Sequence, residues 1–180
     1  MVFERTSLEG LVVVTLELRE DERGHLARTY CEDEFRREGL NVRWPQCNAT
    51  LTRRRGMLRG LHYQADPVPE IKLIRCLAGR VWDVVVDVRP DSASYGRWEA
   101  FELSATNNRQ LYVPAGFAHG FQCLEDDSRL FYMMSEPYRP ELARGIRWDD
   151  PTLKLPWPVA DPELSRRDRE LPGLEPRNND

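Results

Sequence analysis

The sequence predicts an all-β fold, either a sandwich or a barrel. Short segments with strand character recur about every ten residues along most of the chain, a spacing typical of both architectures. In segment 81–89 the apolar side chains alternate with the period of a β-strand, and one face is formed by Trp82, Val84, Val86 and Val88. The charged, Pro-rich stretch from Pro151 is better suited to wrapping a barrel than to forming its wall.

The first quarter of the chain is predicted to contain two strands and a helix. Segment 11–18 is rich in aliphatic and β-branched residues, which favour a strand, and segment 26–30 is a second strand candidate. Residues 21–24 (Asp-Glu-Arg-Gly) indicate a turn between them. A helix is predicted at 32–38, because acidic residues come first, basic residues follow, and Gly39 ends the pattern.

Strands dominate the rest of the chain up to the Pro-rich tail. Apolar and β-branched residues are concentrated in short runs, and Gly, Pro, Asn and Asp separate the runs as turn residues. The predicted strands are segments 56–64, 71–76, 81–89, 98–103, 110–113, 120–124 and 130–135.

Length and composition limit the possible classes of protein. A chain of 180 residues is expected to form one domain, here residues 1–180. With 41% hydrophobic and 31% charged residues, the composition is that of a folded protein. No apolar run approaches the about 18 residues of a membrane span, so we expect no membrane association. A net charge of −4 argues against nucleic-acid binding.

The cysteines and the first residues of the chain predict a cytoplasmic protein. The four cysteines are widely spaced and form no CxxC pair, which argues against a zinc site. The first five residues do not resemble a secretion signal. We therefore expect reduced thiols in the cytoplasm.

Histidines are the first candidates for chemistry, because imidazole transfers protons near neutral pH. The chain has three, and two of them lie in strand-like or glycine-containing segments: His62 in Arg59-Gly-Leu-His-Tyr-Gln64, and His119 in segment 114–121. A single histidine on a strand is more often a packed structural residue than a base. The sequence pattern alone leaves both interpretations open.

Lysine is rare in this chain, which makes each lysine informative. There are 24 arginines but only two lysines, Lys72 and Lys154. Lys72 lies in a strand, where a compact ammonium can be directed at one oxygen atom. Tyr132 is a candidate general acid on another strand. Asp168 either belongs to a solvated run of charges or orients a histidine.

The segment Pro114-Ala-Gly-Phe-Ala-His119 resembles the second half-motif of metal-binding cupins. The first half-motif would supply two further histidines and a glutamate, but His62 is followed by Tyr and Gln. Scattered imidazoles do not complete a set of three or four ligands. We therefore predict no metal.

Taken together, the motifs resemble the dTDP-4-dehydrorhamnose 3,5-epimerase family of cupin-type proteins. They cover nearly the whole chain in order, and the combination of RGLHYQ at 59–64 with PAGFAHGF at 114–121 is specific. The other matching segments are 21–24, 46–48, 72–73, 83–89, 92–98, 148–151 and 157–158. The resemblance implies a jelly-roll barrel, usually a homodimer, that acts on a nucleotide-linked 4-keto-6-deoxyhexose. It also implies that the reaction needs no metal and no organic cofactor.

The resemblance also implies a role for each site residue. His62 would be the general base, Asp168 the carboxylate that orients it, Tyr132 the acid on the opposite face, and Lys72 the cation facing the ketone oxygen. Substrate contacts are expected from Gln46, Asn48, Arg59, His119, Tyr138 and Arg167. Arg23 matches a contact to the diphosphate that would be delivered across a dimer interface.

One local difficulty concerns Arg59 and His62, which are both expected in the same site. Strict alternation places them on opposite faces of a strand. A β-bulge at Gly60 would reset the parity. Alternatively, Arg59 reaches the site from the rim of the barrel.

The chain departs from the family pattern at positions that face the nucleotide. Arg28 stands where a Glu is common, and Ala143 stands where a second Glu is common. Glu70 replaces a common Gln, and Arg167 replaces a Lys. These departures leave open the nucleotide and sugar, and whether C3, C5 or both are inverted.

Three further functions compete with a 3,5-epimerase. One is a related ketoisomerase or single-site epimerase for another deoxysugar. Another is a non-catalytic cupin that only binds a sugar nucleotide, although a binder has no need of both a base and an acid. The last is a metal-dependent oxygenase.

Overall fold

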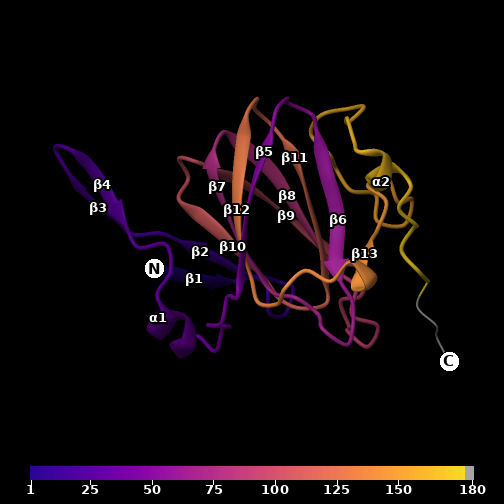
Figure 1. The fold of residues 1–180 in the computed structure, drawn as a ribbon, viewed down its shortest axis with the longest axis horizontal. Coiled ribbons are helices and arrows are strands. Elements are labelled where there is room, and N and C mark those ends of the chain that lie inside the picture. The colour runs from indigo at the N-terminus through magenta and orange to yellow at the C-terminus, as the bar shows by residue number, and fades with distance from the viewer. Residues whose placement is uncertain (177–180) are drawn as a thin grey trace.

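The structure is a computed structural model that describes residues 1–176, and it consists mainly of two facing antiparallel sheets (Figure 1). Within these residues, one sheet has six strands in the order β1-β2-β10-β7-β12-β5, and the other has five in the order β13-β6-β11-β8-β9. The two sheets form the jelly-roll barrel that the family resemblance implied. The prediction of an all-β fold is confirmed.

The bounds of the elements are as follows. The six-stranded sheet consists of β1 (Val2–Arg5), β2 (Val12–Thr15), β10 (Arg109–Val113), β7 (Lys72–Ala78), β12 (Ser128–Met134) and β5 (Gln46–Thr52). The five-stranded sheet consists of β13 (Ala143–Gly145), β6 (Leu58–Gln64), β11 (Phe117–Cys123), β8 (Arg80–Asp87) and β9 (Trp98–Ser104). The remaining elements are the hairpin strands β3 (Leu18–Asp21) and β4 (Gly24–Ala27), the helices α1 (Glu32–Arg37) and α2 (Arg166–Arg169), and the 3₁₀ turn η1 (Pro140–Leu142).

The core lies between the two sheets, and each sheet also buries part of its outer face. Alternate residues of β8, such as Val81 and Val85, belong to the cluster between the sheets. The apolar face predicted for segment 81–89 packs on the other side of the sheet, where Val84 and Val86 contact Leu153 and other residues of the tail. The tail therefore wraps the barrel as predicted (Figure 1). The outer face of the six-stranded sheet is covered by α1 through Phe35.

Several boundaries differ from the prediction. The prediction of a single strand at 11–18 is wrong. Strand β2 ends at Thr15, and the chain then leaves the barrel to form β3. The second strand is β4 at 24–27 rather than 26–30. Strands β1, β5 and β13 were not predicted. The sequence of β5, Gln-Cys-Asn-Ala-Thr-Leu-Thr, lacks apolar alternation because β5 is an edge strand with much of its outer side exposed.

The β3-β4 hairpin projects away from the barrel, as the indigo strands at the left of Figure 1 show. Its two strands pair only with each other. Leu26 on β4 is 70% exposed. The hairpin is therefore an arm with little support from its own barrel.

Candidate active site

A cavity of about 360 Å³ opens between the two sheets and is lined by residues from both sheets and from the tail. It brings together eight of the eleven predicted site residues, namely Asn48, Arg59, His62, Lys72, His119, Tyr132, Arg167 and Asp168. Segments that are far apart in the sequence thus supply one site. Asp168 comes from the tail, which α2 brings against β6.

His62 and Asp168 form a hydrogen-bonded pair at the cavity wall. The distance from His62 Nε2 to Asp168 Oδ1 is 2.7 Å, and the carboxylate side chain is 6% exposed. Ser165 caps α2 by accepting a hydrogen bond from the Asp168 backbone N–H at 3.1 Å, which fixes the carboxylate. Burial acts to raise the pKa of the Asp168 carboxyl, but hydrogen bonds from His62, the Gly60 backbone and Ser165 hold it below its ordinary value. Asp168 is therefore ionised at neutral pH.

The strand β6 contains a bulge that directs both Arg59 and His62 into the cavity. Along β6 and β11, His62 pairs with His119 and Arg59 pairs with Phe121, so Gly60 and Leu61 together oppose one residue, Gly120. Gly60 has φ +128°, and a Cβ there would lie 2.4 Å from the Gly120 Cα. Only glycine fits this position. The bulge predicted at Gly60 is confirmed.

Tyr132 and Lys72 face His62 from the opposite sheet. Tyr132 lies on β12 and Lys72 begins β7, both in the six-stranded sheet, whereas His62 lies in the five-stranded sheet. Burial, together with the nearby Asp83 carboxylate, raises the pKa of the Tyr132 phenol, so the phenol stays protonated. A neutral proton donor and a histidine thus border the cavity from two sides.

A second histidine–carboxylate pair lies deeper in the barrel. His119 Nε2 is 2.8 Å from Asp83 Oδ2, and both side chains are buried. Burial raises the pKa of the Asp83 carboxyl, while His119 and Lys72 act in the opposite direction. The sequence analysis did not single out Asp83 as a site residue. The feature of the sequence that could have identified Asp83 is its place as a polar residue at an inward-facing position of an otherwise apolar strand.

Thr50 on β5 is another residue that the sequence reasoning missed. Its side chain lines the cavity, and its hydroxyl is buried. Buried hydroxyls are normally paired. Thr50 is close enough to the Tyr132 phenol to act on it: burial raises the pKa of the phenol, and a hydrogen bond with Thr50 acts in the opposite direction.

The remaining predicted residues lie outside the cavity. Gln46 accepts a hydrogen bond from the Tyr138 backbone N–H at 2.9 Å, and Gln46 Nε2 lies 3.5 Å from Asn48 Oδ1. This places Gln46 and Tyr138 beside Asn48, which lines the cavity. Arg23 is not brought to the cavity of its own chain. It lies at the tip of the hairpin and pairs with Asp21.

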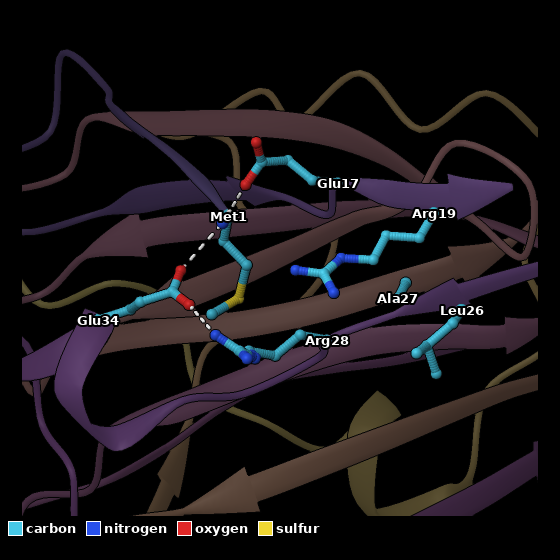
Figure 2. A pocket seen from close by; sticks show the side chains of 7 residues that line it. All are labelled: Met1, Glu17, Arg19, Leu26, Ala27, Arg28 and Glu34. Atoms are coloured by element: carbon cyan, nitrogen blue, oxygen red, sulfur yellow. Dashed lines mark hydrogen bonds and ion pairs between the residues drawn. The ribbon is translucent and has the colours of Figure 1, made fainter.

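A second pocket, of about 340 Å³, lies at the base of the hairpin (Figure 2). Here Arg28, the residue that departs from the family pattern, donates to Glu34 at 2.7 Å. The N-terminal amine of Met1 also donates to Glu34, at 2.9 Å. These two hydrogen bonds lower the pKa of the Glu34 carboxyl. Figure 2 shows Arg19 and Leu26 on the hairpin side of the same pocket.

The described part of the chain contains neither a metal-binding cluster nor a membrane-spanning helix. Within residues 1–176, no three His, Cys, Asp or Glu side chains are grouped so that they could hold a metal ion. No helix in that part of the chain is long and apolar enough to cross a membrane.

Comparison with known proteins places this site in a family. The profile of the dTDP-4-dehydrorhamnose 3,5-epimerases matches residues 5–176. The dTDP-4-dehydrorhamnose 3,5-epimerase of Methanothermobacter thermautotrophicus is 42% identical over 170 residues, which are 93% of this chain and 91% of the relative. The crystal structure of the Bacillus anthracis enzyme with TDP and PPi bound superposes with a TM-score of 0.94 at 36% identity, covering 96% of this chain and 99% of that one. A 3'-monoepimerase from Streptomyces bikiniensis in complex with dTDP-quinovose gives 0.89 at 35% identity, covering 94% and 86%.

The family model and the curated relatives make this chain an isomerase of the carbohydrate epimerase class. The chain belongs to the dTDP-4-dehydrorhamnose 3,5-epimerase family.

Proposed function

We propose that this protein epimerises a dTDP-linked 4-keto-6-deoxyhexose at C3, C5 or both, as a step in deoxysugar biosynthesis. One observation carries the proposal: the cavity places an oriented histidine and a protonated phenol on opposite sheets. Inversion at carbon requires removal of a proton from one face and its return to the other. Two proton-transfer groups on opposite walls meet this requirement.

The carbonyl at C4 of the substrate makes the chemistry possible. C3 and C5 are both adjacent to it, so their hydrogens become acidic when the enolate oxygen is stabilised. The Lys72 ammonium would stabilise this oxygen, as a preorganised oxyanion donor does. His62 would remove the proton, and Tyr132 would return one from the opposite face. Because burial raises the pKa of Tyr132, the phenol holds its proton until the enolate accepts it.

The Asp168 carboxylate would select the histidine nitrogen that acts as the base. Asp168 is ionised and accepts only, so His62 Nε2 carries the hydrogen in the 2.7 Å hydrogen bond. The lone pair is then on Nδ1. Asp168 also stabilises the imidazolium that forms when Nδ1 takes the proton.

Arg59 and Arg167 would bind the diphosphate, because guanidinium groups form paired hydrogen bonds with phosphate oxygens. Arg59 Nε already donates to Thr52 Oγ1 at 3.0 Å, which fixes the side chain at the cavity wall. Both arginines line the cavity. Gln46, Asn48 and Tyr138 are then positioned to contact the nucleoside.

We also propose that the protein is a homodimer in which the hairpin of one copy reaches the cavity of the other. The exposed Leu26 supports this, as does Arg75 on the outer face of the six-stranded sheet. Arg75 is half-buried, burial lowers its pKa, and among the described residues no carboxylate pairs with it. In the dimer, Arg23 would reach the diphosphate of the partner's substrate.

Mixing two inactive variants tests the dimer arrangement. Arg23→Ala lacks the residue that serves the partner's cavity, and His62→Ala lacks the base in its own. Each mixed dimer would contain one complete site of its two, and random pairing makes about half of the dimers mixed, so co-expression should bring the total activity to about a quarter of the wild-type value. Mixed dimers with no more activity than the parents would contradict delivery in trans, and light scattering gives the oligomeric state directly.

Inversion at a single carbon is a second candidate function. The S. bikiniensis neighbour is a 3'-monoepimerase. Arg28, which departs from the family pattern, has a structural role here, because it donates a hydrogen bond to Glu34 at the base of the hairpin.

The deciding experiment is deuterium exchange in D₂O with dTDP-4-keto-6-deoxyglucose, read by NMR. Exchange with inversion at C3 and C5 would establish a 3,5-epimerase, and exchange at C3 alone a monoepimerase. Binding without exchange at either carbon would indicate a sugar-nucleotide-binding protein and overturn the proposed reaction.

The cytoplasm is the compartment that we propose for this reaction. All four cysteines are free in the structure, which fits a reducing environment.

A further inference from the structure

A carboxylate that the proposed reaction does not use lies beside the Lys72 ammonium. Glu70 Oε1 pairs with Lys72 Nζ, and the two side chains are 8% and 9% exposed. Glu70 Oε2 is buried and has no hydrogen-bond partner among the described residues. Glutamate and lysine are almost never buried unless paired. The two residues therefore form one unit inside the barrel.

The backbone around Glu70 is fixed to the neighbouring strand. The Ile71 N–H donates to Ser135 Oγ at 2.8 Å, and the Ser135 N–H donates to the Ile71 carbonyl at 3.0 Å. Ser135 directly follows β12, the strand that carries Tyr132. Glu70 is thus held in a constant position relative to both Lys72 and Tyr132.

A second carboxylate competes for the same ammonium. Asp83 on β8 is buried, and its Oδ1 has no hydrogen-bond partner among the described residues. Burial raises the pKa of the Asp83 carboxyl, and the charge of Lys72 acts in the opposite direction together with His119, so Lys72 and Asp83 interact across the barrel. A lysine ammonium sits on a flexible four-carbon stem and follows the strongest nearby charge. In the structure it is Glu70 that binds it.

We propose that Glu70 is a positioning residue for the epimerisation: it holds the Lys72 ammonium at the cavity wall and prevents it from moving toward Asp83. This rests on the proposed function, in which Lys72 stabilises the enolate oxygen. The Glu70 carboxylate occupies one of the three ammonium hydrogens and leaves the others for the substrate. Glu70 does not itself contact the reacting atoms.

The test compares Glu70→Gln with Glu70→Asp. The Gln variant keeps the shape and removes the charge, so the ammonium is free to move toward Asp83. We expect its kcat to fall roughly 10- to 100-fold, as for a misplaced catalytic group, with KM changed by less than about threefold. The Asp variant keeps the charge on a shorter stem, and its kcat should lie between the wild-type and Gln values. Glu141→Gln, the same change at an exposed site on η1, is the matched control.

The double variant Glu70→Gln/Lys72→Met shows whether Glu70 acts through Lys72. Its rate of deuterium exchange should equal that of Lys72→Met alone, because the ammonium is already absent. A further loss in the double variant, or equal losses of dTDP affinity and turnover in Glu70→Gln, would mean that Glu70 is structural or binds substrate. Wild-type turnover in both the Gln and Asp variants overturns the inference. If Glu70→Gln does not fold, Glu70→Asp alone decides, by a fall in kcat with KM unchanged.

The failure of this inference is distinguishable from failure of the proposed function. If Lys72→Met itself exchanges deuterium at the wild-type rate, the role of Lys72 fails and the role of Glu70 fails with it. If Lys72→Met is slow but both Glu70 variants are normal, only the inference about Glu70 fails.

Discussion

The barrel and the hairpin contain the same local motif, an aspartate paired with an arginine two residues later, in two very different environments. In the barrel, Asp87 is fully buried and accepts from Arg89 Nη2 at 2.7 Å. Ser92 and Ser94 also donate to it, each at 2.6 Å. On the hairpin, Arg23 Nη2 donates to Asp21 at 2.5 Å, but the side chains are 84% and 49% exposed.

This comparison indicates that the two regions hold their charged groups in different ways. In the barrel, charged groups are fixed by buried partners before any substrate arrives: His62 by Asp168, Lys72 by Glu70, and His119 by Asp83. On the hairpin, ion pairs are exposed to water, which weakens them and leaves the side chains mobile. Changes in the barrel should therefore affect chemistry or stability, and changes on the hairpin should affect assembly and affinity.

The largest expected effect is that of His62→Ala. Loss of the base should lower turnover by roughly 10² to 10⁴. The melting temperature should stay close to that of the wild type, because the apolar strand faces hold the barrel together. Near-normal turnover of His62→Ala would remove His62 from the mechanism.

Tyr132→Phe should separate proton removal from proton return. The base remains, so the variant should still exchange deuterium with solvent. Without the acid on the opposite sheet, it should form product inverted at C5 at least roughly 10²-fold more slowly. The measurement is NMR of the substrate in D₂O beside a product assay. If exchange and inversion fall by the same factor, Tyr132 is not a separate acid.

Lys72→Arg should depress turnover more than substrate binding. A guanidinium is larger and planar, so its charge would be displaced from the enolate oxygen in the space that Lys72 and Glu70 now fill. The loss of transition-state stabilisation, calculated from the fall in kcat, should approach that caused by removing one oxyanion donor, about 3 kcal/mol. Steady-state kinetics and calorimetric binding of the nucleotide sugar measure the two effects. A loss of affinity alone would make Lys72 a diphosphate contact, with His119 as the next candidate for the enolate.

The fold could be predicted from the sequence wherever one strand face is apolar. Segment 81–89 alternates strictly, and it forms β8 within two residues of the prediction. In the two main sheets that the structure describes, the edge strand β9 was predicted, but the edge strands β1, β5 and β13 were not, because β5 is polar and β1 and β13 have only four and three residues. The turn predicted at 21–24 does join the two strands of the hairpin, but the start of the hairpin was missed. Its first strand continues an aliphatic run without a break, and only the tertiary structure shows where the chain leaves the barrel.

The site could be predicted only as far as its residues belong to recognisable motifs. His62, Lys72 and His119 lie in such motifs, and the structure places them around one cavity. Asp83 and Glu70 were not predicted as site residues, because their roles depend on a partner from a different strand or on burial. The parity of Asp83 was nevertheless informative: it lies on the face opposite to Trp82 and Val84, which made it an inward-facing polar residue.

The smallest effects come from neutralising the two Asp-Arg pairs, and these test the comparison directly. Burial opposes ionisation of Asp87, but hydrogen bonds from Arg89, Ser92 and Ser94 lower its pKa to about 2. Because the folded-state pKa lies below the unfolded value, Asp87 stabilises the fold at neutral pH and loses this contribution as the pH falls from about 4 toward 2. Asp87→Asn should cost about 2 kcal/mol at pH 7.

Asp21→Asn removes the same kind of pair from the hairpin, where both groups are exposed, and should leave the stability of the chain unchanged at every pH. Urea unfolding at pH 7 and pH 3 measures the free energy of unfolding of the wild type and of both variants. The difference in unfolding free energy between the wild type and Asp87→Asn should shrink at the lower pH. At pH 3 the wild-type protein has lost part of the stabilisation that comes from the low folded-state pKa of Asp87. Equal destabilisation by the two variants at pH 7 would show that burial does not separate the two pairs, and the distinction between a preorganised barrel and an exposed arm would then fail.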